Sequence, residues 1–235
     1  MRTGEVDGEW ISLGVGITKK TCQIGKRGHR PNFWSQISVK FSFEACDASC
    51  PSIILRIGTG INQEHRTVEK LAQLMDENET SQFRIEESNK SGSRIVNCTI
   101  ALVKIIELAP SIHLWEPRFI LDVAKSQKGN GVELYKKNNF VDAFYLFSSA
   151  IKLLISLEVQ LRKAINVEET QNSQDPMLEQ VTETIAVLYS NMGACHLQLK
   201  NYGSALKLSQ EALDYNQTDI KAMYRKASAL IGKIL

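Results

Sequence analysis

The chain has 235 residues, of which 43% are hydrophobic and 23% are charged; 28 Lys and Arg stand against 26 Asp and Glu, a formal net charge of +2. These proportions are typical of globular proteins and exclude a collagen, a coiled coil and a disordered chain. The near balance of charge excludes the usual strongly basic nucleic-acid binder, so no nucleic-acid partner is expected. The length predicts one or two domains.

The N-terminus and the cysteines indicate the cellular compartment in which the protein is expected. The first residues carry acids and lack an apolar core, so no signal peptide is expected. The apolar run at 100–103 is broken by Lys104, far short of the ~20 residues of a membrane helix, and no membrane partner is expected. We therefore expect a cytoplasmic protein that can also enter the nucleus. Its five scattered cysteines predict reduced thiols, with no metal and no cofactor; they are Cys22, Cys46, Cys50, Cys98 and Cys195.

Residues 1–110 are predicted to form a β-rich domain. Segment 36–43 alternates apolar and polar residues, which is the period of a half-buried strand. Segments 53–57, 82–85 and 95–108 give further strands, the last of them long. Between them, Val68, Leu71, Ala72 and Met75 recur with the spacing of one short amphipathic helix. The pattern predicts an α+β domain, a twisted antiparallel sheet wrapped on one short helix.

The sequence of this half indicates neither a nucleotide-binding glycine motif nor a set of catalytic side chains. Gly14 with Gly16 and Gly58 with Gly60 are incomplete glycine motifs, and neither opens a helix in a strand–helix–strand unit. We predict that both pairs form turns. No Ser-His-Asp or Cys-His arrangement is recognisable, so no catalytic residue is assigned.

Residues 111–235 are predicted to be helical throughout. A connecting helix is expected at 111–125, with Pro117 near a start or kink. After it, Gly131 is followed by an aromatic residue 9 positions later and by alanines at 12 and 19, and Gly193 is followed by the same pattern. This spacing is typical of the tetratricopeptide (TPR) repeat, in which small residues let paired helices approach each other and the aromatic residue closes their turn.

The distance between the two repeats predicts their surroundings. The glycines lie 62 positions apart, more than one repeat length, so a longer second helix to about 165 and a polar connection at 166–174 are expected. Asp175 and Pro176 then predict a helix start, and Thr218 is predicted to cap a last helix. The expected architecture is an all-α TPR helical solenoid with two repeats and the first helix of a third.

Equivalent positions of successive repeats stack into one groove. On this basis Lys128, Asn191, Lys221 and Arg225 are predicted to converge, and Lys221 and Arg225 share one helical face. Three cations and an amide suit a carboxylate-rich extended peptide, to which Arg donates a two-pronged bond. The alternative is four solvated surface residues with no ligand, and the charges alone favour it.

Several segments resemble a known family. Residues 19–25, Pro31 and residues 37–41 resemble the opening strands, residues 57–60 the turn before the helix, and residues 103–108 the closing strand of immunophilins that join an FKBP-type prolyl isomerase domain to TPR repeats. In these relatives, residues matching the four above grip the acidic C-terminal tail of heat-shock chaperones. The resemblance therefore favours a working clamp, although Val132 stands where strong clamps often have a second Asn.

The resemblance also implies a degenerate isomerase pocket. The family holds a proline ring in an apolar cup walled by aromatic residues, and here a flap at 86–93 has lost its aromatic residue and proline, while Asp47 is the only acid near the cup. Because such catalysis depends on shape and desolvation, we expect no isomerase activity. The positions that match the cup are Phe41, Leu55, Asn62, Gln63, Thr67 and Ala101.

These observations predict a non-catalytic adaptor or co-chaperone. The expected partners are a heat-shock chaperone tail and, from the resemblance to inactive members of the family, a casein-kinase-type clock kinase. Two alternatives stay open. The first is a weakly active peptidyl-prolyl cis-trans isomerase. The second is a scaffold that dimerises through an exposed last helix, because a lone helix of an incomplete repeat leaves one apolar face uncovered.

Overall fold

The chain divides into two compact units, unit 1 (Met1–Leu114) and unit 2 (Trp115–Leu235), whereas the sequence predicted a boundary after residue 110. The computed structural model describes residues 8–14, 16–43, 50–89, 92–167 and 175–234, and the side chains of all of these except 87–89, 92, 166 and 167. Predictions made for Cys46, Asp47, the side chains at 87–92 of the flap and residues 168–174 of the polar connection lie outside the described residues.

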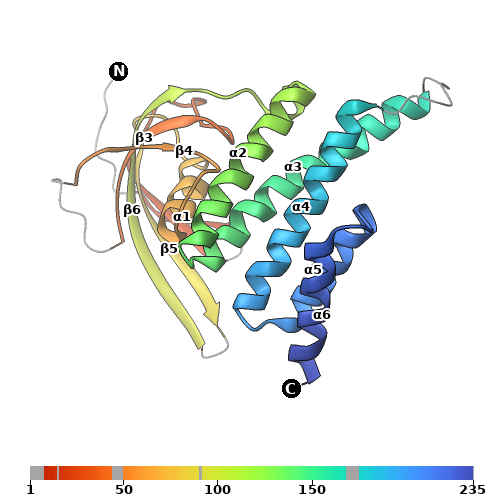
Figure 1. Ribbon diagram of the computed structural model, residues 1–235. Helices are drawn as coiled ribbons and strands as arrows, with labels where there is room; N and C mark the ends of the chain where they lie inside the picture. The colour runs from red at the N-terminus through yellow and green to blue at the C-terminus, as the bar shows by residue number, and fades with distance from the viewer. Residues whose placement is uncertain (1–7, 15, 44–49, 90–91, 168–174, 235) are drawn as a thin grey trace. The chain divides into compact units, whose positions relative to one another are not determined.

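Unit 1 is an antiparallel sheet curved around one helix, as the sequence predicted (Figure 1). The strand order is β1-β2-β5-β6-β3-β4. Helix α1 (Gln63–Ala72) lies between β4 and β5 in the chain. The strands are β1 (Trp10–Gly14), β2 (Ile17–Gln23), β3 (Gln36–Ser42), β4 (Ile53–Arg56), β5 (Thr80–Asn89) and β6 (Gly92–Glu107).

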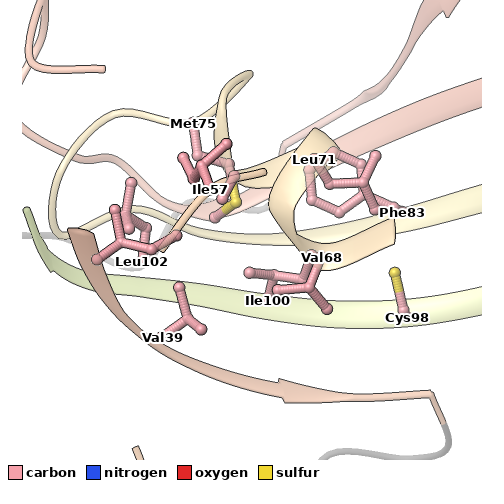
Figure 2. Packing of buried hydrophobic residues seen from close by; sticks show 11 residues of the cluster. Val39, Ile57, Val68, Leu71, Met75, Phe83, Cys98, Ile100 and Leu102 are labelled. Carbon is pink, nitrogen blue, oxygen red and sulfur yellow. The ribbon is translucent and has the colours of Figure 1, made fainter. Parts of the chain in front are cut away.

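The core of unit 1 lies between α1 and the concave face of the sheet. Val68 and Leu71 of α1 meet Phe83 of β5 and Ile100 of β6, and all four side chains are buried (Figure 2). Met75, just after the helix, is buried with them. Full burial of each large apolar side chain contributes roughly 1.5–3 kcal/mol. The helical spacing read from the sequence is therefore confirmed by burial of the whole stripe.

An ion pair ties strand β2 to the segment that follows α1. Lys19 Nζ lies 2.7 Å from Glu79 Oε1, and the two side chains are only 12% and 5% exposed. Lys19 also donates to the carbonyl of Leu74 at 2.7 Å. The carboxylate of Glu79 accepts further bonds from the Ser81 hydroxyl and the Asp76 amide. Because every polar contact is satisfied, the buried charges fix the path of this segment beneath the sheet.

Replacing Glu79 by Ala leaves the Lys19 ammonium buried without its counter-charge. We expect the free energy of unfolding of unit 1 to fall by about 3 kcal/mol. Native-state hydrogen exchange of the β2 and β5 amides measures this loss. The control is Glu107→Ala, because the Arg56–Glu107 pair is 29% and 57% exposed, and removing an exposed pair costs about 1 kcal/mol or less. Equal losses in both variants would contradict the role given to the buried pair.

Unit 2 consists of helices that pack in sequence order (Figure 1). Pro117 is the first residue of α2, so the connecting helix and the first helix of the first repeat are one continuous element rather than two. Alternate helices are also neighbours, since α4 packs against both α2 and α6. The helices are α2 (Pro117–Lys136), α3 (Phe140–Val167), α4 (Pro176–Gln198), α5 (Tyr202–Tyr215) and α6 (Ile220–Ile234).

The repeat glycines lie where paired helices approach most closely. A Cβ at Gly131 would lie 2.5 Å from the ring of Phe147, and one at Gly193 would lie 3.0 Å from Ser209 Oγ. Phe147 and Ser209 each follow their glycine by 16 positions. Alanines at the repeat positions, such as Ala143 and Ala205, are fully buried. The predicted role of the small residues is therefore confirmed in both helix pairs.

The turns inside the two repeats are also equivalent. Asn138 has φ 59° and Lys200 has φ 56°, and both are seven positions after the repeat glycine. The next amide in each turn donates back to a carbonyl of the preceding helix, at 3.0 Å and 2.8 Å. Such a left-handed residue is a common way to end a helix and satisfy its last carbonyls.

The start of α4 agrees with the sequence and the start of α6 does not. Asp175 Oδ1 accepts from the Met177 amide at 2.8 Å, with proline following, as predicted. At α6 the cap is Asp219, whose carboxylate accepts from the Lys221 amide at 2.8 Å. Thr218 instead donates to the Asn216 side chain. The observed cap is one residue later than the predicted one, because Asp is an equally good capping residue and directly precedes the helix.

Helix α3 carries a feature that the search for uninterrupted apolar runs overlooked. Over Phe140–Ile165 it is long and apolar enough to cross a membrane by length and composition alone, and its most apolar 18-residue window has a mean hydropathy of 1.6. Single charges such as Lys152 and Glu158 interrupt it. In unit 2 this helix packs between α2 and α4, and 44% of its most apolar window is buried.

The last helix has a largely exposed apolar side. Tyr224, Ile231 and Ile234 of α6 are 72%, 61% and 84% exposed. The dimer expected through this helix stays a prediction.

The described cysteines are free thiols. Cys98 lies in the core of unit 1 and Cys195 in α4, and burial raises their pKa values to about 11 and about 12. Cys22 and Cys50 are half-buried.

Candidate functional site

A pocket of about 410 Å³ lies in unit 2, between α4 and the start of α6. Asn191, Lys221 and Arg225 line it. The repeat register therefore brings three of the four predicted clamp residues to one hollow. Lys128 is half-buried on α2 and is not among the residues that line this pocket.

Arg225 is held in place by a residue that the sequence analysis missed. Its guanidinium donates from Nη1 to the hydroxyl oxygen of Ser190, which is 3% exposed. Burial lowers the pKa of Arg225 from its ordinary value, although a guanidinium stays protonated in proteins. Ser190 immediately precedes Asn191 on α4, and nothing in its type or spacing marked it, because its role depends on the approach of α6.

The charges of the pocket favour an anion. Lys221 and Arg225 contribute two cations, and Asp219 contributes one carboxylate. That carboxylate already accepts the amides of Lys221 and Ala222 as the cap of α6. The side-chain donors of Asn191, Lys221 and Arg225 suit a carboxylate, because charge-assisted bonds to carboxylates are about twice as strong as neutral ones.

Apolar side chains lie beside these donors. Val187 of α4 and Ile220 of α6 also line the pocket and are 43% and 79% exposed. A ligand with a carboxylate next to a small apolar side chain would satisfy both kinds of wall. The end of an acidic peptide that carries such a residue has this chemistry.

The residues that match the isomerase cup have other roles in unit 1. Phe41 lies edge-on to Phe43 and to His65, with ring centroids 5.9 Å and 6.0 Å away. Leu55 packs against the buried core. A histidine ring therefore lies against Phe41, where an apolar cup for a proline ring would need room.

The polar cup positions serve α1 itself. Asn62 is the N-cap of α1, and its side-chain oxygen accepts from the His65 amide at 2.8 Å. The Thr67 hydroxyl donates to the carbonyl of Gln63 at 2.9 Å, and the Gln63 side chain is exposed. These contacts stabilise the first turns of the helix.

Ala101 does not face the cup. It pairs with Lys40 and Thr80 on the neighbouring strands, while Ile100 and Leu102 on either side of it are buried in the core. Because successive residues of a strand point to opposite faces, Ala101 lies on the outer face of the sheet. The alignment by resemblance was out of register here, and a one-residue shift is enough to change the face.

A buried carboxylate lies beneath the turn that precedes α1. Glu69 of α1 is 5% exposed, and its Oε2 accepts from the Gly58 amide at 3.0 Å. Burial raises its pKa from 4.5 to about 7. Gly58 has φ 97°, and a Cβ there would lie 2.4 Å from the ring of Phe33, so the turn needs glycine. The sequence did not single out Glu69, because a glutamate within a helix is ordinarily exposed. Its place on the inner side of α1 is visible only in the structure.

We expect the free energy of unfolding to fall as pH rises from about 4.5 to about 7. Over this range the folded chain holds a proton on Glu69 that the unfolded chain has released, so raising the pH favours unfolding. The loss amounts to roughly 3 kcal/mol. Urea denaturation at a series of pH values measures it, and the same series on Glu69→Gln should lack this part of the slope. Identical slopes in the two proteins would contradict the assignment.

Comparisons with known proteins give relatives that are much longer than this chain. No protein-family model matches it. It is 28% identical over 111 residues to FK506-binding protein 5 of Rhizopus delemar, a match that covers 47% of this chain and 26% of that protein. It is 29% identical over 108 residues to the Hsp70/Hsp90 co-chaperone CNS1 of Saccharomyces cerevisiae, covering 46% and 22%. The matches thus span about a quarter of the length of these relatives.

A solved structure resembles most of the chain. The crystal structure of residues 1–211 of CG17282 matches with a TM-score of 0.61 at 22% identity, covering 85% of this chain and 98% of that one. At this identity the likeness establishes the fold alone. The fold is an antiparallel sheet region followed by a helical region, which confirms the predicted fold class.

Proposed function

We propose that the chain is a non-catalytic adaptor or co-chaperone whose helical unit binds the acidic C-terminal tail of a heat-shock chaperone. The observation that carries the proposal is the pocket between α4 and α6, where Asn191, Lys221 and Arg225 meet. Its donors suit a terminal carboxylate, and its apolar walls suit a neighbouring small side chain. Similarity to FK506-binding protein 5 and to the Hsp70/Hsp90 co-chaperone CNS1 supports the same role.

A calorimetric titration with a peptide that ends in Glu-Glu-Val-Asp tests the pocket. We expect micromolar binding, and no detectable binding in Lys221→Ala/Arg225→Ala, because removing partners of a charged contact costs ~2–5 kcal/mol. The same peptide with an amidated C-terminus should bind much more weakly than the free acid.

The matched control is Lys226→Ala. Lys226 is on the same helix, but its ammonium donates to Gln210 of α5 at 2.6 Å and it does not line the pocket. Its removal should leave binding unchanged. Free-acid peptide that fails to bind the unaltered chain, or that binds the double variant equally well, would refute the pocket as the site.

The absence of isomerase activity is part of the proposal. The positions that match the cup are a Phe against a histidine ring, a Leu packed against the core, polar side chains that serve α1, and an alanine on the outer face. These placements support an inactive domain. A weakly active peptidyl-prolyl cis-trans isomerase remains the second candidate, favoured by the retained sheet and helix.

A proline-peptide assay separates the two candidates. We expect the chain to give no rate above the uncatalysed reaction, because shape and desolvation supply this catalysis and the cup is lost. The sensitive form of the assay uses chain in large excess over its usual catalytic amount. A rate that rises in proportion to the concentration of the chain would favour the isomerase instead.

The proposal extends to a client. The sequence resembles the insect protein Bride of Doubletime in size, layout and missing pocket, and on that resemblance we propose a casein-kinase-type clock kinase, Doubletime, as a second partner. Such an adaptor would work in the cytoplasm and also in the nucleus. Binding of the purified kinase to the Lys221→Ala/Arg225→Ala variant would show that the client does not use the tail pocket.

A further inference from the structure

A second hollow lies in unit 1, on the sheet rather than between helices. Its volume is about 700 Å³, and it extends over β5 and β6, with Trp10 of β1 and Phe43 at its margins. Gln82, Arg84 and Asn97 are among the residues that line it. The tail pocket in unit 2 shares none of these residues.

The strand register fixes which side chains share the outer face of the sheet. Directly paired residues of neighbouring strands lie on the same face. One row across the sheet consists of Trp10, Lys20, Gln82, Thr99 and Ser42. The adjacent rows consist of Ser12, Thr18, Arg84 and Asn97, and of Gln23, Thr80, Ala101 and Lys40.

These three rows are rich in donors and carry no acid. Their charged members are Lys20, Lys40 and Arg84, and the others are amides, hydroxyls, Trp10 and Ala101. Glu86 follows only in the next row along β5. These three rows hold cations and no carboxylate, so this part of the face complements an anionic ligand.

Arg84 is placed for such a contact. Its guanidinium carbon lies 3.9 Å from the centroid of the Trp10 ring, a cation–π stack between β5 and β1. Stacking uses the flat face of the guanidinium and leaves its N–H groups at the edge, where they bind carboxylates in a fork. The Arg84 side chain is exposed, so this edge is open to a ligand.

The spread of the cations selects the kind of anion. Arg84 is on β5 and Lys40 is on β3, two strand steps away in the sheet order, and the row of Lys40 meets β5 at Thr80, four residues from Arg84. At about 4.8 Å a step and 3.4 Å a residue this is roughly 17 Å, the length of about five residues of an extended chain. A single small anion could not span it. Nucleic acid fits poorly, because Trp10 is the one aromatic side chain in these rows and Arg84 already covers it.

We propose that the outer face of this sheet binds an acidic, extended segment of a protein partner, with Arg84 and Lys40 as its cationic contacts. The site is distinct from the tail pocket, and it needs no free C-terminus. It gives the non-catalytic domain a binding role that uses the convex side of the sheet rather than the lost cup.

The test is a titration of the whole chain with a glutamate-rich peptide that is acetylated at its N-terminus and amidated at its C-terminus. We expect binding that weakens as salt is added and a shift of the Trp10 indole N–H signal in NMR spectra. Arg84→Ala and Lys40→Ala should each weaken binding about tenfold, as loss of a charge-assisted contact predicts. The Lys221→Ala/Arg225→Ala variant should bind the peptide normally, which separates this site from the tail pocket.

The matched control is Lys70→Ala, which removes an exposed cation from α1, on the other side of the sheet. It should leave binding unchanged. The proposal is overturned if no binding is detected, if Arg84→Ala and Lys40→Ala bind normally, or if only the tail-pocket variant loses binding. Tighter binding of a single-stranded oligonucleotide than of the peptide would assign the face to nucleic acid instead.

Discussion

The close approach of paired helices at Gly131 and Gly193 determines where the side chains of unit 2 lie. With no side chain at these positions, α2 packs on Phe147 of α3 and α4 packs on Ser209 of α5. The two pairs stack, and α6 meets α4 with Arg225 opposite Ser190. The pocket is thus a product of small residues that never touch a ligand.

The two proposed binding faces rest on different physics. The tail pocket contains Arg225, which is half-buried against Ser190 of α4, so a carboxylate bound there would contact a partly desolvated cation. The outer face of the sheet is open, and its cations are spread over several strands. Exposed charges are screened by salt more than buried ones, so the first contact would persist at ionic strengths that weaken the second.

Much of the fold was readable because it depends on period and spacing. The stripe Val68–Leu71–Met75 and the repeat glycines are local patterns with one structural solution. Strand β1 was not readable, because its apolar Ile11 and Leu13 are exposed on an edge and show no half-buried alternation. Ser190, Glu69 and the Arg84–Trp10 stack could not be predicted, since each depends on a partner brought close only by the tertiary fold. The prediction that Ala101 faces the cup was wrong, because similarity of sequence does not fix strand register to one residue.

The distribution of the thiols has a practical consequence for chemical labelling. Cys98 and Cys195 are buried with raised pKa values, so at neutral pH they are protonated and react slowly with alkylating reagents. Cys22 is half-exposed and lines the hollow on the outer face of the sheet. Cys50 is also a half-buried free thiol but does not line this hollow, so of these two thiols Cys22 is the one that reports on the open face. A molecule bound there would protect Cys22 from alkylation, while the slowly reacting thiols of Cys98 and Cys195 serve as an internal reference.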